Sequence, residues 1–385
     1  MTNSLGRRLR LGIIGGGPGS LIGETHRIAA RLDGRYDIVA GSFSSDVGRT
    51  NEMAAELCID SGRAYGSWQQ MLEDEAKRVD RIDVVAVMTP NDSHRAICMA
   101  ALEKGFHVIC DKPLANELNQ AREIAAMVER SGLEFCVTYC YSGFPMVRQA
   151  RDMILQGEIG EVRQIHLQYV QSYLSDHDLP NAWRTDTTRA GKSLVLLDIG
   201  THAFHLGAFV TGRDVTRLCS DLGSAIPGRK IDDYVSALLR YDNGARGSLW
   251  VTNAAAGSEH GLSFRVHGDK GGLEWHQEDP NRLHHRRQGG FDHIITRRPG
   301  LEMSEGAQRS TRIAIGHPEG YLEAFANLYT EFADQVTRRI LNKEPANLKR
   351  LFPNVIDGVK GLAFVDAAVE SAQTGSWRDI EYSSR

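Results

Sequence analysis

LRLGIIGGGPGSLIGETH, residues 9–26, is the stretch that decides the fold. Its first residues form a short apolar run, which is typical of a strand buried on both faces of a parallel sheet. Glycines follow this run, and glycine permits positive φ and lets a backbone come close to a ligand. A strand, a glycine turn and a helix bring unpaired N–H groups and the positive end of a helix dipole to one point. The stretch therefore predicts a pyrophosphate site.

The dinucleotide pattern G-x-G-x-x-G fits Gly15 and Gly17, but its third position falls on Ser20. We expect a longer loop that Gly23 closes. A tight turn without a ligand is the alternative, but the position of the turn after the first strand favours nucleotide binding. The turn residues predicted to bind the cofactor are Gly15, Gly17, Pro18, Gly19, Ser20, Leu21 and Ile22.

The end of the second predicted strand decides which dinucleotide binds, because a carboxylate there holds the ribose 2′-hydroxyl and excludes a 2′-phosphate. The sequence has Ser44 and Ser45 at this place, with Asp46 slightly late and Arg49 within one turn. Serine donates to a hydroxyl or to a phosphate, so NAD is expected and NADP is not excluded. Asp46 is equally suited to cap a helix over 47–58.

Two further strand ends carry polar residues. The strand predicted over 83–88 is followed by Thr-Pro-Asn, and the strand over 107–110 by Asp-Lys-Pro. In an open parallel sheet the ligand lies outside the carboxyl ends of the strands, so these turns and the glycine turn converge on one crevice. The residues that we assign to the cofactor from these turns are Thr89, Pro90, Asn91, His94, Asp111 and Lys112.

Strands alternate with helices up to residue 141, which predicts a doubly wound, parallel α/β domain of the Rossmann type over 1–141. The second domain, 142–385, is expected to be α+β with a large, mainly antiparallel open sheet, because strand runs are joined by turn signals. Apolar sheet faces of this sort often pack against a partner, so we expect a homo-oligomer, a dimer or a tetramer. Strands are expected at 38–42, 134–139, 162–170, 234–241, 245–252, 262–267 and 272–275. Helices are expected at 24–32, 91–103 with Asn91 as cap, 117–131, 146–156, 321–341 and 355–373.

Composition bounds the class of protein. A chain of 385 residues with 41% hydrophobic and 24% charged residues is ordinary for a soluble, two-domain enzyme. A net charge of −4 does not favour binding to nucleic acid or to an anionic membrane. The basic residues at 284–287 and 297–298 are assigned to a solvated loop. The six cysteines lack metal-site spacing and indicate a reduced, cytoplasmic protein. The N-terminal apolar run is too short for a signal peptide or a membrane span.

Taken together, the motifs resemble the Gfo/Idh/MocA family of NAD(P)-dependent oxidoreductases. The matching stretches are GIIGGG (12–17), TPNDSH (89–94), DKP (111–113), WR (183–184) and DIGTH (198–202). The usual Glu-Lys-Pro of the family is Asp-Lys-Pro here, the glycine loop is longer, and serine replaces the common acid after the second strand. HPEGYLEAF (317–325) is similar to members that act on sugars, inositols and glucosides.

The resemblance implies a catalytic set. Oxidation of a secondary alcohol needs a base for the hydroxyl proton and a positive group beside the developing alkoxide. The resemblance gives these roles to His202 and Lys112, with Asp198 orienting the hydroxyl or tuning His202, and it implies a cis peptide before Pro113. Asp198 and His202, four apart, share one face of a helix; a helix cap and a core histidine are the alternative. The residues expected to contact the substrate besides these three are Tyr141, Trp183, Arg184, His317 and Tyr321, with Tyr141 also contacting the cofactor.

Three functions remain open. The first is a dehydrogenase that acts on a secondary hydroxyl of a sugar, glycoside or polyol, for example a glucoside 3-dehydrogenase or an inositol dehydrogenase. The second is an NAD-dependent glycosidase, such as a sulfoquinovosidase. Such an enzyme oxidises a carbon of the sugar ring, eliminates the glycosidic group, adds water and reduces the ring carbon again. The third is a non-catalytic nucleotide sensor, which does not need a base such as His202. Asp198, His202 and His205 can also ligate a metal, but no fourth ligand accompanies them, so no metal is expected.

Overall fold

The computed structural model describes residues 5–177, 189, 191–298, 300, 303–343 and 350–382. The chain forms two compact units. The first unit comprises the residues up to Ala115 together with Asn119–Cys140 and Phe325–Gly358, and the second comprises Asn116–Leu118, Tyr141–Ala324 and the residues from Val359. The sequence analysis assigns all of 142–385 to the second domain, whereas the first compact unit takes up a segment from late in the chain.

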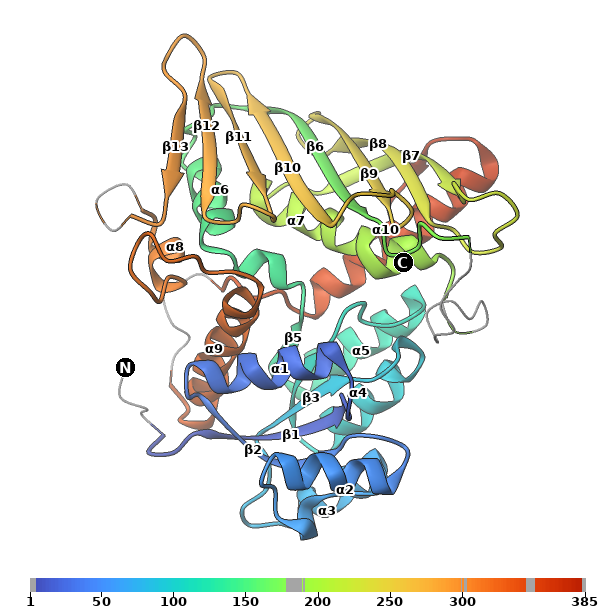
Figure 1. The fold of residues 1–385 in the computed structure, drawn as a ribbon, viewed down its shortest axis with the longest axis vertical. Helices are drawn as coiled ribbons and strands as arrows, with labels where there is room; N and C mark the ends of the chain where they lie inside the picture. Colours follow the sequence, from blue (N-terminus) through green and yellow to red (C-terminus); the bar gives the residue numbers. More distant parts are fainter. Residues whose placement is uncertain are drawn as a thin grey trace. The chain divides into compact units, whose positions relative to one another are not determined.

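The first unit is built on a five-stranded parallel sheet in the order β2-β1-β3-β4-β5. The expected doubly wound α/β fold is therefore confirmed. Figure 1 shows α1 and α3 on opposite sides of this sheet, and the central strand β3 is buried along its whole length. The strands are β1 (Leu9–Gly15), β2 (Tyr36–Ser42), β3 (Val84–Met88), β4 (His107–Cys110) and β5 (Phe135–Val137). Its helices before residue 140 are α1 (Leu21–Leu32), α2 (Val47–Glu56), α3 (Trp68–Lys77), α4 (His94–Glu103) and α5 (Leu118–Ser131).

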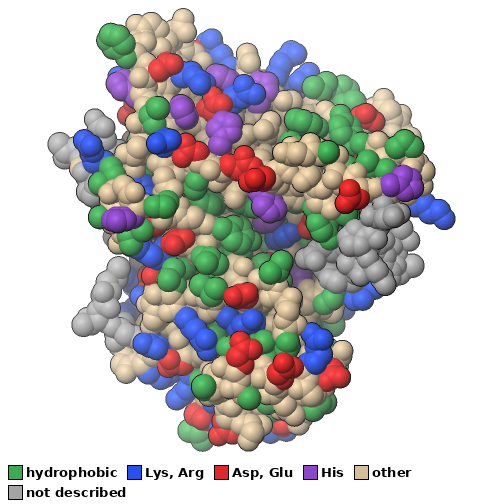
Figure 2. Space-filling model, viewed as in Figure 1, with side chains coloured by type: hydrophobic (Ala, Val, Ile, Leu, Met, Phe, Trp, Pro, Cys, Tyr) green, Lys and Arg blue, Asp and Glu red, His purple; other side chains and the backbone are tan. Residues whose placement is uncertain are grey.

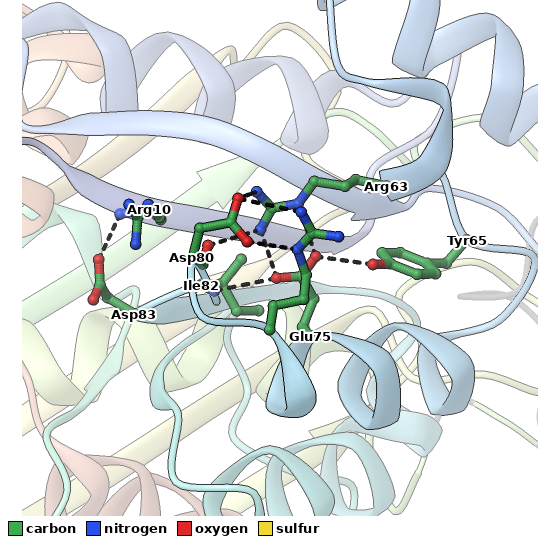
Figure 3. A network of polar contacts seen from close by, with 8 residues as sticks. Arg10, Arg63, Tyr65, Glu75, Asp80, Ile82 and Asp83 are labelled. Atoms are coloured by element: carbon green, nitrogen blue, oxygen red, sulfur yellow. Dashed lines mark hydrogen bonds and ion pairs between the residues drawn. The ribbon is translucent and has the colours of Figure 1, made fainter.

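The helix α3 is not among the predicted helices. It is fastened by Glu75, which is fully buried. The Glu75 carboxylate accepts two hydrogen bonds from the Arg63 guanidinium, at 2.8 Å and 2.5 Å (Figure 3). It also accepts from the Tyr65 hydroxyl at 2.9 Å and from the Ile82 N–H at 3.2 Å. A buried carboxylate satisfied in this way ties α3 to the segments on both sides of it.

The second unit contains a nine-stranded sheet in the order β13-β12-β11-β10-β6-β9-β8-β7-β14. All neighbouring strands are antiparallel except β6 and β9, which are parallel. This confirms the expected large, mainly antiparallel sheet. The strands are β6 (Val162–Gln171), β7 (Val215–Gly223), β8 (Tyr234–Tyr241), β9 (Arg246–Thr252), β10 (His260–Gly268), β11 (Gly271–His276), β12 (Arg282–Arg287), β13 (His293–Thr296) and β14 (Arg378–Asp379).

Helices of the second unit cover one face of this sheet (Figure 1). α6 packs against β11 and β12, and α7 packs against β6, β9 and β10. On β8 and β9, Leu238 and Trp250 remain 54% and 43% exposed. The remaining helices are α6 (Pro145–Leu155), α7 (Thr201–Thr211), α8 (Glu305–Arg309), α9 (Tyr321–Ile340) and α10 (Val355–Thr374). The chain passes from the second unit to the first within α9 and back within α10.

Two local predictions are wrong. The basic residues at 284–287 form part of the strand β12, not a solvated loop, and Leu283 and His285 of this strand point inward and are buried. Arg286 and Arg287, at the end of this strand, are exposed. On the face drawn in Figure 2, basic, acidic and histidine side chains are mixed. Asn91 does not cap α4, because residues Asn91–Ser93 form a short 3-10 turn before it.

All six cysteines are free, and four of them are buried, while Cys58 is exposed. Over the described parts of the chain, none of the helices combines the length and the apolar character needed to cross a bilayer.

Candidate active site

The glycine turn joins β1 to α1 in the first unit. Gly15, Gly16 and Gly19 have φ values of 87°, 67° and 78°, a region that favours glycine. Ser20 caps α1, and its hydroxyl accepts from the Gly23 N–H at 3.1 Å. The first N–H groups of α1 therefore lie directly after the turn, which is the arrangement that binds a phosphate.

Gly23 packs directly on the turn. A Cβ atom on Gly23 would lie 2.5 Å from the Gly16 Cα, and one on Gly17 would lie 2.8 Å from the Phe43 carbonyl oxygen. Neither position has room for a side chain. Close packing of the helix on the strand is the role of the third glycine in dinucleotide sites, and Gly23 fills it. These residues fit a bound dinucleotide through a longer loop.

The end of β2 lies beside this turn, and it carries no free carboxylate. The Asp46 carboxylate caps α2 by accepting from the Arg49 N–H at 2.9 Å, which was one of its two expected uses. The Ser44 hydroxyl accepts from the Asp46 N–H at 3.1 Å. The Arg49 guanidinium donates to the Pro18 carbonyl at 2.6 Å, so it lies against the glycine turn, while Ser45 is exposed.

His94 ties the ends of β3 and β4 together. Its ring is fully buried, with Nδ1 2.9 Å from the Pro113 carbonyl oxygen and Nε2 2.9 Å from the Thr89 carbonyl oxygen. Both oxygens only accept, so a neutral ring donates to one of them at a time. Burial lowers the pKa of His94, although the nearby Asp111 and the two carbonyls act in the opposite direction. The neutral ring therefore prevails at pH 7.

The turn after β4 holds Lys112, which is half-buried, and the Lys112-Pro113 peptide is cis as the resemblance implied. Asp111 is buried, and its carboxylate accepts from the Thr138 hydroxyl at 2.6 Å. The same carboxylate oxygen lies 3.5 Å from Nε2 of His26. Burial alone would raise the pKa of Asp111, but its contacts with His26, Lys112 and Thr138 hold it well below its usual value. Asp111 is therefore ionised.

The second unit carries Asp198 in a helical turn of unusual form. Residues Leu196–Gly200 form a π-helical turn that runs directly into α7, and the Thr201 N–H donates to the Leu196 carbonyl five residues back. The sequence predicts an ordinary helical face for Asp198 and His202, not this turn. π-Helical turns inside helices occur frequently at functional sites, because the extra residue redirects a side chain.

His202 lies among aromatic side chains of the same unit. Its ring centroid is 4.9 Å from that of Tyr141 and 6.2 Å from that of Tyr169, both in edge-on arrangements. The Tyr141 and Tyr169 hydroxyls are 2.5 Å apart. Tyr169 is not among the predicted site residues; its only sequence signal is its inward position in the alternation of β6. His205, one turn further on, stacks on Phe209 with centroids 5.9 Å apart.

The remaining predicted residues are spread over the second unit. The Tyr321 ring is 36% exposed and its centroid lies 6.2 Å from that of Tyr141. His317 is exposed, and its carbonyl accepts from Arg297. Trp183 and Arg184 lie outside the described residues. In the part of the chain that the structure describes, no group of three or more His, Cys, Asp or Glu side chains is arranged to hold a metal ion.

A glycine turn closed by Gly23, at the head of a parallel sheet, defines a dinucleotide-binding protein. The chain matches two family models: residues 9–139 match the oxidoreductase family with an NAD-binding Rossmann fold, and residues 147–274 match the GFO/IDH/MocA C-terminal domain. The protein is an NAD-binding oxidoreductase. It belongs to the Gfo/Idh/MocA family, as its motifs suggested.

Three relatives cover nearly the whole chain. An uncharacterized oxidoreductase of Bacillus subtilis, YfiI, is 34% identical over 97% of this chain and 96% of its own length. The crystal structure of an inositol dehydrogenase homolog from Azotobacter vinelandii, complexed with NADH and myo-inositol, is 37% identical. It superimposes with a TM-score of 0.90 over 97% of this chain and 98% of that one. The levoglucosan dehydrogenase of Pseudarthrobacter phenanthrenivorans is 25% identical over 97% and 98% of the two chains.

Proposed function

We propose that this protein oxidises a secondary hydroxyl group of a sugar, glycoside or polyol with NAD. The observation that carries the proposal is the placement of Asp198 in a π-helical turn next to His202, whose ring lies against Tyr141 and Tyr169. This half of the site offers a base, a carboxylate and tyrosine hydroxyls to a polyhydroxylated ligand. The names of the relatives, which include an inositol dehydrogenase homolog and a levoglucosan dehydrogenase, support the same class of substrate.

In the proposed mechanism His202 takes the proton of the substrate hydroxyl, because an imidazole is a suitable base near neutral pH. The Lys112 ammonium group, in the turn after β4, is assigned the stabilisation of the negative charge that develops on the substrate oxygen. Asp198 accepts from the hydroxyl or from His202 and fixes its direction. Bound NAD supplies the chemistry of hydride acceptance. The turn residues 15–22 would hold its phosphates, and Ser44 and Arg49 would contact the ribose beside the end of β2.

Substrate specificity is assigned to residues around this centre. The aromatic face of Tyr141 suits a pyranose or cyclitol ring, whose C–H groups pack on a π system. Tyr321, near Tyr141, widens that surface. The other residues that we propose as substrate contacts are Trp183, Arg184 and His317.

The test is a substrate panel with NAD, read as absorbance of reduced cofactor at neutral pH. The panel includes myo-inositol, levoglucosan, free hexoses and methyl glucosides. The variants Lys112→Ala and His202→Ala are each expected to lower kcat by roughly 10²- to 10⁴-fold while binding of NADH, followed by its fluorescence, is retained. Thr25→Ala, on the exposed face of α1, is the matched control and retains activity.

Other outcomes overturn the proposal. Release of nitrophenol from a nitrophenyl glycoside with only catalytic NAD assigns the protein to the glycosidase class instead. NADH binding without turnover of any carbohydrate or polyol, together with full biological activity of the Lys112→Ala/Asp198→Ala/His202→Ala variant, assigns it to nucleotide sensing.

We further infer that the protein forms a homo-oligomer through the sheet face that bears Leu238 and Trp250, since large exposed apolar side chains on a sheet mark interaction surfaces. Light scattering on the eluted protein is expected to give a dimer or tetramer mass, and Leu238→Lys/Trp250→Lys is expected to lower it. A monomeric wild-type protein contradicts the inference.

A further inference from the structure

The turn at residues 111–113 is held on both sides of Lys112 by histidines from two different helices. His26 of α1 contacts the Asp111 carboxylate, with Nε2 3.5 Å from Oδ1. His94 of α4 contacts the Pro113 carbonyl, with Nδ1 2.9 Å from the oxygen. Both histidines are buried, at 1% and 0% exposure. Neither ring belongs to the catalytic set that the resemblance implies.

The His26 side of this arrangement extends into a buried polar chain. Nδ1 of His26 lies 2.7 Å from the Tyr329 hydroxyl, and the Tyr36 hydroxyl donates to the Tyr329 carbonyl at 2.8 Å. Burial raises the pKa of Tyr329 far above its usual value, so its hydroxyl keeps its proton. Nε2 of the same ring faces the Asp111 carboxylate. A distance of 3.5 Å is long for a hydrogen bond, so this contact is mainly electrostatic.

The cost of burying these groups indicates a role beyond packing. An ionised carboxylate in the interior is expensive unless charges or donors compensate it, and apolar residues of similar volume would be no less stable. Here the Thr138 hydroxyl donates to the carboxylate, His26 lies 3.5 Å from it, and Asp111 stands next to Lys112 in the chain. A carboxylate held in this way fixes the backbone of the turn, and with it the point from which the Lys112 side chain extends.

We propose that His26 and His94 are positioning residues that clamp the Asp111–Pro113 turn and thereby aim Lys112 at the reacting hydroxyl of an NAD-linked oxidation. His26 acts through the carboxylate of Asp111, and His94 acts through the carbonyl of Pro113. This inference rests on the proposed function for the role of Lys112, but the clamp itself is a property of the first unit alone. It also gives a physical reason for His94 in the TPNDSH stretch, because the ring links the turns that follow β3 and β4.

The first measurement does not depend on turnover. Hydrogen exchange followed by mass spectrometry is expected to show faster exchange of the amides of residues 111–116 in His26→Phe and His94→Phe, with exchange in β1 unchanged. Tyr36→Phe removes a hydroxyl from the same buried chain without touching the turn, so it is the matched control and leaves residues 111–116 protected. The affinity of His26→Phe for NADH, measured by fluorescence, is expected to stay within about threefold of the wild type, since the glycine turn and the residues assigned to the cofactor are unchanged in this variant.

The second measurement tests whether the two histidines position Lys112 for catalysis. With a substrate from the panel, His26→Phe and His94→Phe are expected to lower kcat about 10- to 100-fold with little change in KM, because misplacement of a catalytic group by about 1 Å has this effect. His26→Gln, whose amide can both donate to Asp111 and accept from Tyr329, is expected to restore most of the rate. In Asp111→Asn, the further change His26→Phe is expected to have almost no additional effect, because the two side chains act as one unit.

Several outcomes overturn the clamp. They are unchanged kcat in both phenylalanine variants, exchange that rises throughout the first unit to the same extent as in the turn, and fully additive effects of His26→Phe and Asp111→Asn. If the wild-type protein binds NADH but oxidises no substrate, the proposed function fails. The exchange experiment then still decides whether the two histidines hold the turn.

Discussion

The Arg63 guanidinium and the Glu75 carboxylate form a buried two-point ion pair, with N–O distances of 2.8 Å and 2.5 Å (Figure 3). Removal of the Glu75 charge leaves the buried Arg63 guanidinium with one acidic partner, Asp80, at 3.4 Å. We expect Glu75→Gln to lower the free energy of unfolding by about 3–5 kcal/mol, as measured by urea denaturation.

Glu73→Gln on the same helix is the matched control for this pair. Glu73 pairs with Lys77 at 3.0 Å on the surface, where its side chain is 48% exposed, so its loss is expected to leave the denaturation midpoint almost unchanged. Equal effects of the two substitutions would show that burial does not determine how much Glu75 contributes to the free energy of unfolding.

Gly23→Ala is expected to weaken NADH binding. Alanine normally favours a helix, but a Cβ here would lie 2.5 Å from the Gly16 Cα and 2.6 Å from the Gly16 carbonyl oxygen, so the glycine turn must move. We expect the dissociation constant for NADH to rise at least about tenfold, equivalent to about 1.4 kcal/mol, in a fluorescence titration. Thr25→Ala is the control and is expected to keep the affinity for NADH. Wild-type affinity in Gly23→Ala would show that close packing of Gly23 on Gly16 is not required for NADH binding.

Acidification is expected to destabilise the first unit through His107. Burial lowers the pKa of His107 to about 4, from 6.5 for a free side chain. Between these two values the unfolded chain binds a proton that the folded chain does not, so stability rises with pH and is lost as the pH falls below 6.5. From pH 6.5 to 5 the loss is roughly 2 kcal/mol.

His107→Asn tests this dependence. Nδ1 of His107 accepts from the Glu134 N–H at 2.9 Å, and an asparagine oxygen can accept there without titrating. Urea denaturation at pH 5 and pH 7 is expected to show a smaller difference in this variant than in the wild type. His276→Asn, on the surface, is expected to keep the wild-type difference in the free energy of unfolding between pH 5 and pH 7. An equally reduced difference in both variants would show that His107 is not its cause.

Ser44→Asp is expected to shift cofactor preference further toward NAD. No carboxylate is free at the end of β2, because Asp46 caps α2, and Arg49 lies beside the turn. A new carboxylate would accept from the ribose 2′-hydroxyl and repel a 2′-phosphate. The ratio of kcat/KM for NADP to that for NAD is expected to fall at least about tenfold, or about 1.4 kcal/mol. Ser44→Asn, of the same shape, controls for size, and an unchanged ratio in Ser44→Asp would place the ribose elsewhere.

Much of the fold was predictable because its signals are local. Apolar periodicity and glycine or asparagine turns mark the strands of the first sheet, five strands of the second sheet (β6, β8, β9, β10 and β11) and most helices within a few residues. The dinucleotide turn was predictable for the same reason, down to the use of Gly23. Lys112, Asp198 and His202 as one catalytic set stay a prediction that the substrate panel tests.

Other features depend on tertiary contacts that no local pattern contains. The π-helical turn at Leu196–Gly200 differs from an α-helix by one residue in its hydrogen bonding, and its residues suit either form. Tyr169 has the pattern of any inward-facing strand residue. The helix over 321–341 was predicted at the correct residues. An amphipathic pattern, however, does not predict against which surface the helix packs. Contacts such as Tyr329 with Tyr36 and Asp334 with Arg35 decide that.

Because Phe325–Gly358 belong to the first unit, the folding of this unit depends on a segment that is synthesised late. A fragment that stops at residue 141 lacks the side chains that cover α1 and β2, so we expect it to bind a hydrophobic dye more strongly than the intact chain does. A compact, NADH-binding fragment would contradict this. We therefore expect the first unit to complete its fold only after residues 325–358 have been synthesised, although its own sheet strands all lie before residue 140.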